Sequence, residues 1–179
     1  MNKLLIFPTD TVYGIGCSIY DIYNIDRIYE IKKRDKSKPL ACLCYDINQI
    51  QDIAYVDDLA KKLINNFLPG GLTLILKSKP KIKELIGYDT IGVRIPDCDV
   101  ALSILKEMGP MLTTSVNDSG EVPLNEYEEI VKKYDKLVDH IYPSNSISSN
   151  VSSTVVKVEN DKLTLLREGN VKLKDLLNV

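Results

Sequence analysis

Small polar side chains gather in two short stretches of the sequence, each directly after an apolar run. The first is FPTDTVYGIG at positions 7–16, and the second is TTSVNDSG at positions 113–120. Hydroxyl, amide and carboxylate groups at strand ends bind polar ligands in α/β domains, and the same residue types also favour turns. Each stretch therefore predicts either part of a polar pocket or a hydrogen-bonded turn. In the first, Gly14 and Gly16 would let the backbone turn sharply or approach a ligand.

Lysine and arginine side chains cluster between positions 32 and 38, at the expected end of a helix. Cations in a last helical turn complement the helix dipole, which would make this cluster a solvated helix end. The same charges could instead hold a phosphate or a carboxylate. The residues alone leave both interpretations open.

Arg94 interrupts an alternating apolar run, TIGVRIP at positions 90–96. In strict alternation its side chain lies on the face opposite to Ile91, Val93 and Ile95. A lone arginine on a strand is usually exposed to solvent. A guanidinium fork also matches a carboxylate through two parallel hydrogen bonds, so Arg94 is a candidate carboxylate ligand.

These groups suit chemistry by positioning and charge stabilisation. The single histidine, His140, has no serine or cysteine partner at a known spacing, and the four cysteines form no C-x-x-C pair. The sequence also lacks G-x-x-x-x-G-K-[ST] and G-x-G-x-x-G motifs. Scattered cations, hydroxyls and an amide fit phosphoryl or nucleotidyl transfer. Asp10 is a candidate general base, and no protein metal site is expected.

Composition is that of an ordinary globular domain. The 179 residues are 44% hydrophobic and 27% charged, and the net charge of -2 gives no overall electrostatic reason to bind nucleic acid. No apolar run is long enough to cross a membrane, and the short apolar N-terminus does not resemble a signal peptide. We therefore expect a cytoplasmic protein that does not interact with membranes.

The hydrophobic pattern predicts alternating strands and helices, and hence one α/β domain over residues 1–179. Asp21 or Asn24 should cap a helix through residues 25–31, because both residue types favour N-caps. The remaining expected elements are strands at 4–7, 40–45, 72–76, 90–96, 110–115, 137–142 and 152–158, helices at 59–67, 100–108, 124–134 and 173–177, a basic loop at 77–83 and a Ser- and Asn-rich loop at 143–151.

Several segments, taken in order, resemble the YrdC family of threonylcarbamoyl-AMP synthases. They are PTDTVYGIG, KKRDKSKPL, LPGGLTLIL, TIGVRIP, TTSVNDSGEVP, STVV and REG. Three positions depart from the family pattern: Gly71 replaces a usual proline, Val116 a usual alanine and Lys157 a frequent acidic residue. The resemblance implies a twisted, mostly mixed β-sheet with flanking helices and a concave ligand-binding face, in the short, single-domain bacterial type.

The resemblance also implies a reaction. Members of the family condense L-threonine, bicarbonate or CO₂, and ATP into threonylcarbamoyl-AMP and pyrophosphate. In the short bacterial type, the product passes to a separate transferase complex that modifies tRNA. Mg²⁺ would be carried by the ATP.

The resemblance assigns site residues by position. Threonine would be held by Thr11, Arg94, Ser115 and Ser153. ATP would be held by Lys32, Arg34, Lys38, Thr90, Asn117 and Arg167. The catalytic set would be Lys32, Arg34, Ser115 and Asn117.

Two other functions share this fold. One is an RNA-binding module that uses the basic residues at 32–38, which implies weak RNA binding. The acidic net charge and the lack of aromatic residues among the basic ones disfavour it. The other is a carbamoyl-adenylate-forming domain like that of hydrogenase-maturation proteins, whose acceptor is not threonine.

Overall fold

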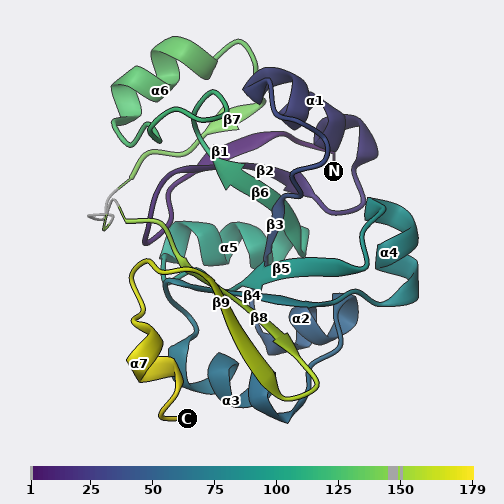
Figure 1. The fold of residues 1–179 in the computed structure, drawn as a ribbon. Coiled ribbons are helices and arrows are strands. Elements are labelled where there is room, and N and C mark those ends of the chain that lie inside the picture. Colours follow the sequence, from purple (N-terminus) through teal and green to yellow (C-terminus); the bar gives the residue numbers. More distant parts are fainter. Residues whose placement is uncertain (1, 145–148, 150) are drawn as a thin grey trace.

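The computed structural model describes residues 2–144, 149 and 151–179 (Figure 1). Within these ranges, nine strands form one sheet in the order β7-β1-β2-β6-β3-β5-β4-β8-β9. The strands are β1 (Leu5–Phe7), β2 (Gly14–Ser18), β3 (Ala41–Leu43), β4 (Leu72–Lys77), β5 (Thr90–Arg94), β6 (Met111–Ser115), β7 (His140–Ile141), β8 (Thr154–Glu159) and β9 (Lys162–Arg167).

Seven helices flank the sheet in the described part of the chain. They are α1 (Ile22–Lys32), α2 (Ile47–Ile53), α3 (Asp58–Phe67), α4 (Pro80–Ile86), α5 (Asp99–Met108), α6 (Tyr127–Tyr134) and α7 (Leu173–Leu176). The pairs β1–β7, β3–β5 and β4–β8 are parallel and the other pairs are antiparallel. The predicted α/β fold with a mixed sheet is confirmed.

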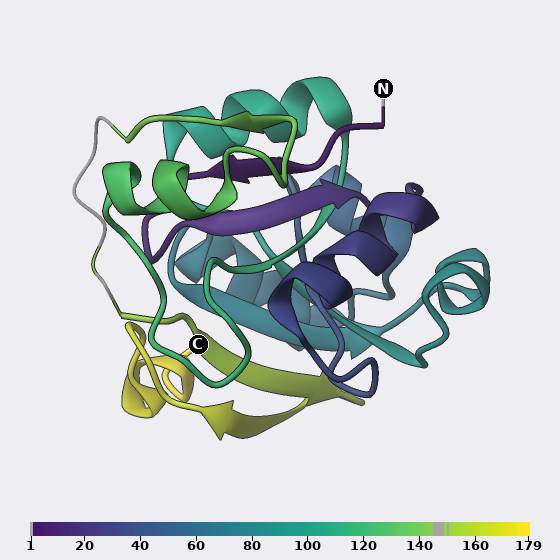
Figure 2. The same cartoon turned by 90° about the horizontal axis from the view of Figure 1, so that it is seen from above.

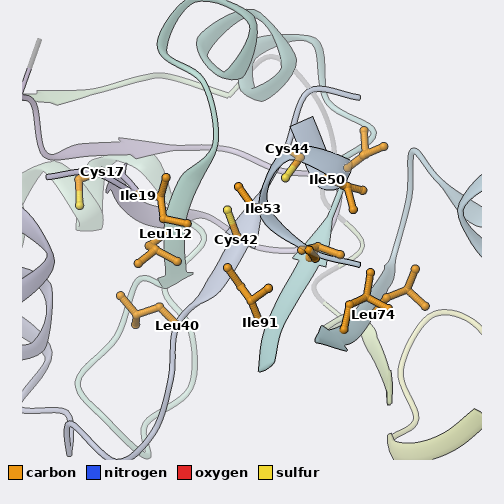
Figure 3. Packing of buried hydrophobic residues seen from close by; sticks show 14 of the residues in the cluster. Cys17, Ile19, Leu40, Cys42, Cys44, Ile50, Ile53, Leu74, Ile91 and Leu112 are labelled. Carbon is orange, nitrogen blue, oxygen red and sulfur yellow. The ribbon is translucent and has the colours of Figure 1, made fainter. Parts of the chain in front are cut away.

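Strand register gives the sheet two chemically different faces. A row of apolar side chains crosses six adjacent strands on one face: Cys17, Leu112, Cys42, Val93, Leu74 and Val156. The next row, on the opposite face, reads Gly16, Thr113, Ala41, Gly92, Ile75 and Lys157. The first row belongs to the main hydrophobic core (Figure 3), whereas the second has small side chains over most of its length.

Helices cover the two faces unequally. The main core, on the apolar face, includes buried residues of α1, α2, α3 and α6. On the other face, α5 packs Ala101, Ile104 and Leu105 against strands β1, β3 and β6, and Figure 2 shows α1 and α5 on opposite sides of β1 and β2. Since α5 covers only part of its face, the rest of that face is available for a ligand site.

Gly14 and Gly16 lie in strand β2. Of their two predicted roles, the sharp turn is therefore wrong, and the close approach to a ligand stays a prediction. A Cβ atom at Gly16 would lie 2.5 Å from Thr113 Oγ1, and one at Gly14 would lie 2.7 Å from Thr113 Cγ2. These glycines therefore let β2 pair closely with β6 beside the Thr113 side chain.

The predicted cap of the first helix is confirmed. Asp21 caps α1 by accepting a hydrogen bond from the Asn24 backbone N–H at 3.2 Å. Asp57, for which no cap was predicted, caps α3 in the same way. Gly109, with a positive φ of 81°, ends α5.

Other predicted elements need correction. The stretch 77–83, expected to be a loop, contains the start of α4, because Pro80 opens a helix well and Ile82 anchors it in the core. Helix α2 was not expected, and the helix predicted at 124–134 begins only at Tyr127. The loop predicted at 143–151 falls partly on residues 145–148 and 150, outside the described residues.

A membrane-spanning segment is not found among the helices of the described chain. Each of them is too short or too polar to cross a bilayer.

Candidate functional site

A cavity of about 330 Å³ lies on the face of the sheet that α5 leaves partly uncovered. Its lining includes three arginines, Arg34, Arg94 and Arg167, and no acidic side chain from the described residues. Eight hydroxyl side chains also line it: Thr9, Thr11, Thr73, Thr113, Thr114, Ser115, Ser152 and Ser153. Cations and hydroxyl donors in a lining without acidic side chains make this a site for an anionic ligand.

Small side chains at the centre of the sheet leave the space for this cavity. Ala41 pairs directly with Gly92 and with Thr113 on the two neighbouring strands. A Cβ atom at Gly92 would lie 3.1 Å from Ile75 Cδ1, which shows how closely the neighbouring side chains approach this position. The cavity floor therefore has little side-chain volume.

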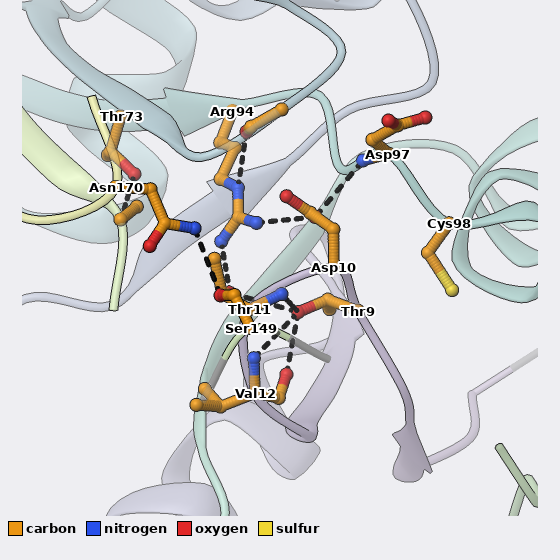
Figure 4. A network of polar contacts seen from close by, with 12 residues as sticks. Thr9, Asp10, Thr11, Val12, Thr73, Arg94, Asp97, Cys98, Ser149 and Asn170 are labelled. Atoms are coloured by element: carbon orange, nitrogen blue, oxygen red, sulfur yellow. Dashed lines mark hydrogen bonds and ion pairs between the residues drawn. The ribbon is translucent and has the colours of Figure 1, made fainter. Parts of the chain in front are cut away.

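Arg94 is 6% exposed and lies at the end of β5, where each of its three nitrogens donates one hydrogen bond (Figure 4). Nε donates to the Gly70 carbonyl at 2.9 Å, Nη1 to Thr11 Oγ1 at 2.8 Å, and Nη2 to Asp10 Oδ1 at 2.5 Å. Burial lowers the pKa of Arg94, and the Asp10 carboxylate acts in the opposite direction. A guanidinium does not lose its proton in proteins, so Arg94 is a cation held from three sides.

The turn between β1 and β2 presents a pair of hydroxyl groups to the cavity. Thr9 Oγ1 donates to the Val12 carbonyl at 2.6 Å and lies 3.1 Å from Thr11 Oγ1. It also accepts the backbone N–H groups of Thr11 and Val12, both at 3.2 Å. These hydrogen bonds of an ST-type turn hold Thr9 Oγ1 beside the Thr11 hydroxyl that Arg94 contacts.

A second polar chain joins β4, β8 and β9. Thr73 Oγ1 lies 2.8 Å from Ser153 Oγ, and Arg167 donates to the Ser153 carbonyl through Nε at 3.1 Å and Nη2 at 2.9 Å. Ser153 thus lies between Arg167, which is predicted to face the nucleotide, and Thr73. Thr73 was not among the predicted site residues, and only its place in the LPGGLTLIL segment could have indicated it.

Lys32 is 1% exposed, and its ammonium is surrounded by oxygens of the β6–α6 connection. It donates to the Ser115 carbonyl at 2.5 Å, the Asn117 carbonyl at 2.6 Å and Asn117 Oδ1 at 3.0 Å. Ser115 Oγ donates to the same Oδ1 at 2.6 Å. A lysine has three N–H donors, so Lys32 is fully used in holding the Ser115–Asn117 segment and does not line the cavity.

The structure brings together six of the ten predicted site residues at the cavity wall: Thr11, Arg34, Arg94, Ser115, Ser153 and Arg167. Lys32 and Asn117 lie immediately behind Ser115. Lys38 is exposed outside the cavity, where its carbonyl accepts hydrogen bonds from Arg34 and Tyr29. Thr90 lines a separate, mostly apolar cavity of about 250 Å³ between α1 and α4.

Asp10, the candidate general base, is not part of the cavity lining. Its Oδ1 accepts hydrogen bonds from Arg94 and from the Asp97 backbone N–H at 3.0 Å. A carboxylate committed to a guanidinium and outside the cavity does not fit a role in taking a proton from a bound amine. The described residues also contain no group of three or more His, Cys, Asp or Glu side chains that could hold a metal ion.

The buried ammonium of Lys32 gives a prediction for stability. Burial, and secondarily the Arg34 charge, lower the pKa of Lys32 from 10.5 to about 8. The unfolded chain then binds more protons than the folded one between these pH values, so this group adds stability as pH rises from 8 to 10.5, by about 3 kcal/mol at most. Urea unfolding of the wild type and of Lys32→Met at several pH values should show this rise only in the wild type. The same pH dependence of the unfolding free energy in both proteins would contradict this prediction.

Comparison with known proteins agrees with this architecture. Residues 1–169 match the family model of the Sua5, YciO and YrdC proteins, which carries the description "Telomere recombination". A protein of Methanocaldococcus jannaschii named putative threonylcarbamoyl-AMP synthase is 40% identical over 177 residues, which cover 98% of this chain and 84% of that protein. The threonylcarbamoyl-AMP synthase of Bacillus subtilis is 34% identical over 175 residues, covering 95% of this chain and 51% of that protein.

A solved structure is also similar to this chain in three dimensions. The crystal structure of Pyrococcus abyssi Sua5 complexed with L-threonine superposes with a TM-score of 0.91 at 29% identity, covering 98% of this chain and 53% of that one. The chain therefore spans about half the length of the Bacillus and Pyrococcus proteins. The match of the family model over residues 1–169 and the 40% identity to the Methanocaldococcus protein show that this chain belongs to the Sua5/YciO/YrdC family.

Proposed function

We propose that the protein is an L-threonylcarbamoyladenylate synthase, a nucleotidyltransferase that acts on L-threonine, bicarbonate or CO₂, and ATP. The observation that carries the proposal is a cavity with three guanidinium groups and eight hydroxyls and no acidic side chain from the described residues. Such a cavity suits two anionic substrates together, a carboxylate and a triphosphate. The names of the relatives support the same reaction.

Arg94 and Thr11 are the proposed ligands of the threonine carboxylate. Three of the five N–H groups of Arg94 have acceptors among the described residues, which leaves one N–H on each terminal nitrogen. A carboxylate can accept both. Ser153, which also lines the cavity, is the proposed contact for the rest of the amino acid.

Arg34 and Arg167 are the proposed ligands of the ATP phosphates. Both line the cavity and donate to backbone carbonyls rather than to carboxylates, so their charges are not neutralised by a salt bridge within the described chain. Mg²⁺ would enter with ATP as part of the substrate. Ser115 would contact the reacting groups, and Lys32 and Asn117 would hold it in place.

In the proposed reaction, the threonine amine attacks carbon dioxide, which bicarbonate supplies by losing hydroxide. The new N–C bond gives a carbamate, and the amine proton leaves to water. A carbamate oxygen then attacks the α-phosphorus of ATP, the bond between that phosphorus and the β-bridging oxygen breaks, and pyrophosphate leaves. The arginines stabilise the negative charge that develops on the phosphates.

The product is a mixed anhydride, so a second enzyme must accept the threonylcarbamoyl group. We propose that a separate complex transfers it to tRNA. The cytoplasm is the proposed location, since all four cysteines are buried free thiols, as is usual in a reducing compartment.

Pyrophosphate release from ATP tests the proposal. With bicarbonate and Mg²⁺ present, we expect release only when L-threonine is added. Equal release without threonine would instead support a carbamoyl-adenylate-forming domain. Absence of release by folded protein, together with RNA binding that weakens steeply with salt, would support the RNA-binding module.

A further inference from the structure

Asp10 has a position that the proposed reaction does not use. Its side chain is mostly buried, at 18% exposure, and forms an ion pair with Arg94, whose side chain is 7% exposed. Arg94 lines the cavity and Asp10 does not. The carboxylate therefore contacts the guanidinium from outside the cavity lining; Figure 4 shows the two side chains joined by this contact.

The carboxylate is itself fixed. Its Oδ1 also accepts the backbone N–H of Asp97, 3.0 Å away, in the turn that joins β5 to α5. The carbonyl of Asp10 accepts the backbone N–H of Ser149 at 3.0 Å. Asp10 thus links the β1–β2 turn, the β5–α5 turn and the segment before β8, and it cannot move without disturbing all three.

We propose that Asp10 is a positioning residue that orients Arg94 for the amino-acid carboxylate, an inference that rests on the proposed function. The Gly70 carbonyl, Thr11 Oγ1 and Asp10 Oδ1 accept one hydrogen bond from each of the three guanidinium nitrogens, which fixes the plane of the group. Two N–H groups are left, one on each terminal nitrogen. What matters in Asp10 is the place of its Oδ1 acceptor rather than its charge, because the charge competes with the substrate carboxylate for Arg94.

Two variants separate position from charge. Asp10→Asn keeps an acceptor oxygen at the same reach and removes the charge, whereas Asp10→Glu keeps the charge and moves it by one methylene. We expect the KM for threonine in Asp10→Asn to equal that of the wild type or to fall. In Asp10→Glu it should rise about tenfold or more, because a displaced guanidinium meets the carboxylate poorly.

The KM for ATP should stay within about twofold in both variants, because Asp10 contacts neither of the arginines proposed to bind the phosphates. A loss of folded protein alone would lower the apparent kcat and leave both KM values unchanged. Asp97→Ala is the matched control. Its side chain is exposed and it keeps the backbone N–H that Asp10 accepts, so its kinetics should match those of the wild type.

Three results would overturn the inference. These are a normal threonine KM in Asp10→Glu, a raised threonine KM in Asp10→Asn, or a rise of both substrates' KM values together. Calorimetric binding of threonine without ATP gives a second readout if a variant is inactive. A wild type that neither binds threonine nor releases pyrophosphate with it would refute the proposed function instead, so the two failures are distinguishable.

Discussion

Replacing Arg94 by alanine should lower kcat/KM for L-threonine by about a hundredfold or more. Truncating one partner of a buried, hydrogen-bonded charge pair costs about 2–5 kcal/mol in binding, and Arg94 is the proposed partner of the threonine carboxylate. Arg94 is 6% exposed, and its removal leaves its buried acceptors without their donor. Pyrophosphate release measured over a range of threonine concentrations gives the value.

The alanine variant also leaves the Asp10 carboxylate without its guanidinium, which lowers stability. Arg94→Lys is therefore a useful second variant, because it keeps a positive charge. It should still lose most of the activity, since one ammonium cannot replace a fork that donates to Gly70, Thr11 and Asp10 from three nitrogens.

Arg27→Ala is the matched control for both. Arg27 donates to Asn24 and to the Leu137 carbonyl and does not line the cavity. Its loss should leave the kinetics unchanged. Wild-type threonine kinetics in folded Arg94→Ala would refute the assignment of Arg94 to the carboxylate.

Local sequence signals predicted the elements that local chemistry controls. Asp21 was a recognisable cap because an N-cap side chain bonds to a backbone N–H three residues away. Apolar runs located β1, β4, β5 and β8. The mixed strand order and the ligand-binding face came from the resemblance to a family, since hydrophobic pattern alone gives only an α/β class.

The remaining features depend on partners far away in the sequence. In the local sequence Gly16 resembles a turn residue. Its role in strand pairing becomes visible only in the fold, where Thr113 packs against it. Arg94 resembles an exposed strand residue, and its ion-pair partner Asp10 is 84 positions away. Pairings of this kind follow from strand order, which a local pattern does not contain.

Partners far away in the sequence also divide the basic cluster at 32–38. Five cations near a helix end suggest a solvated surface or a phosphate clamp. The structure divides them instead: Lys32 is buried against Asn117, 85 positions away, Arg34 reaches the cavity, and Lys38 faces solvent. Neighbouring charges of one type therefore have three different environments.

Replacing Lys32 by methionine should reduce kcat about a hundredfold with only moderate loss of stability. The ammonium donates to the Ser115 carbonyl and to two oxygens of Asn117, and its loss frees the segment that carries the Ser115 hydroxyl. Misplacement of a catalytic group by about 1 Å is enough for a loss of this size. Unsatisfied oxygens destabilise the variant, but removing a buried charge offsets part of that cost, which leaves about 1–3 kcal/mol.

Lys33→Met is the matched control, because Lys33 is the next residue, its side chain is 80% exposed, and its contact with Asp118 is a surface ion pair. Its kinetics and melting temperature should match those of the wild type. Stopped-assay kinetics with ATP as the varied substrate distinguish the two roles of Lys32. If Lys32 holds the loop, its replacement lowers kcat. If Lys32 binds phosphate directly, its replacement raises the KM for ATP without loss of stability. The second result would show that Lys32 leaves its three oxygens when ATP binds.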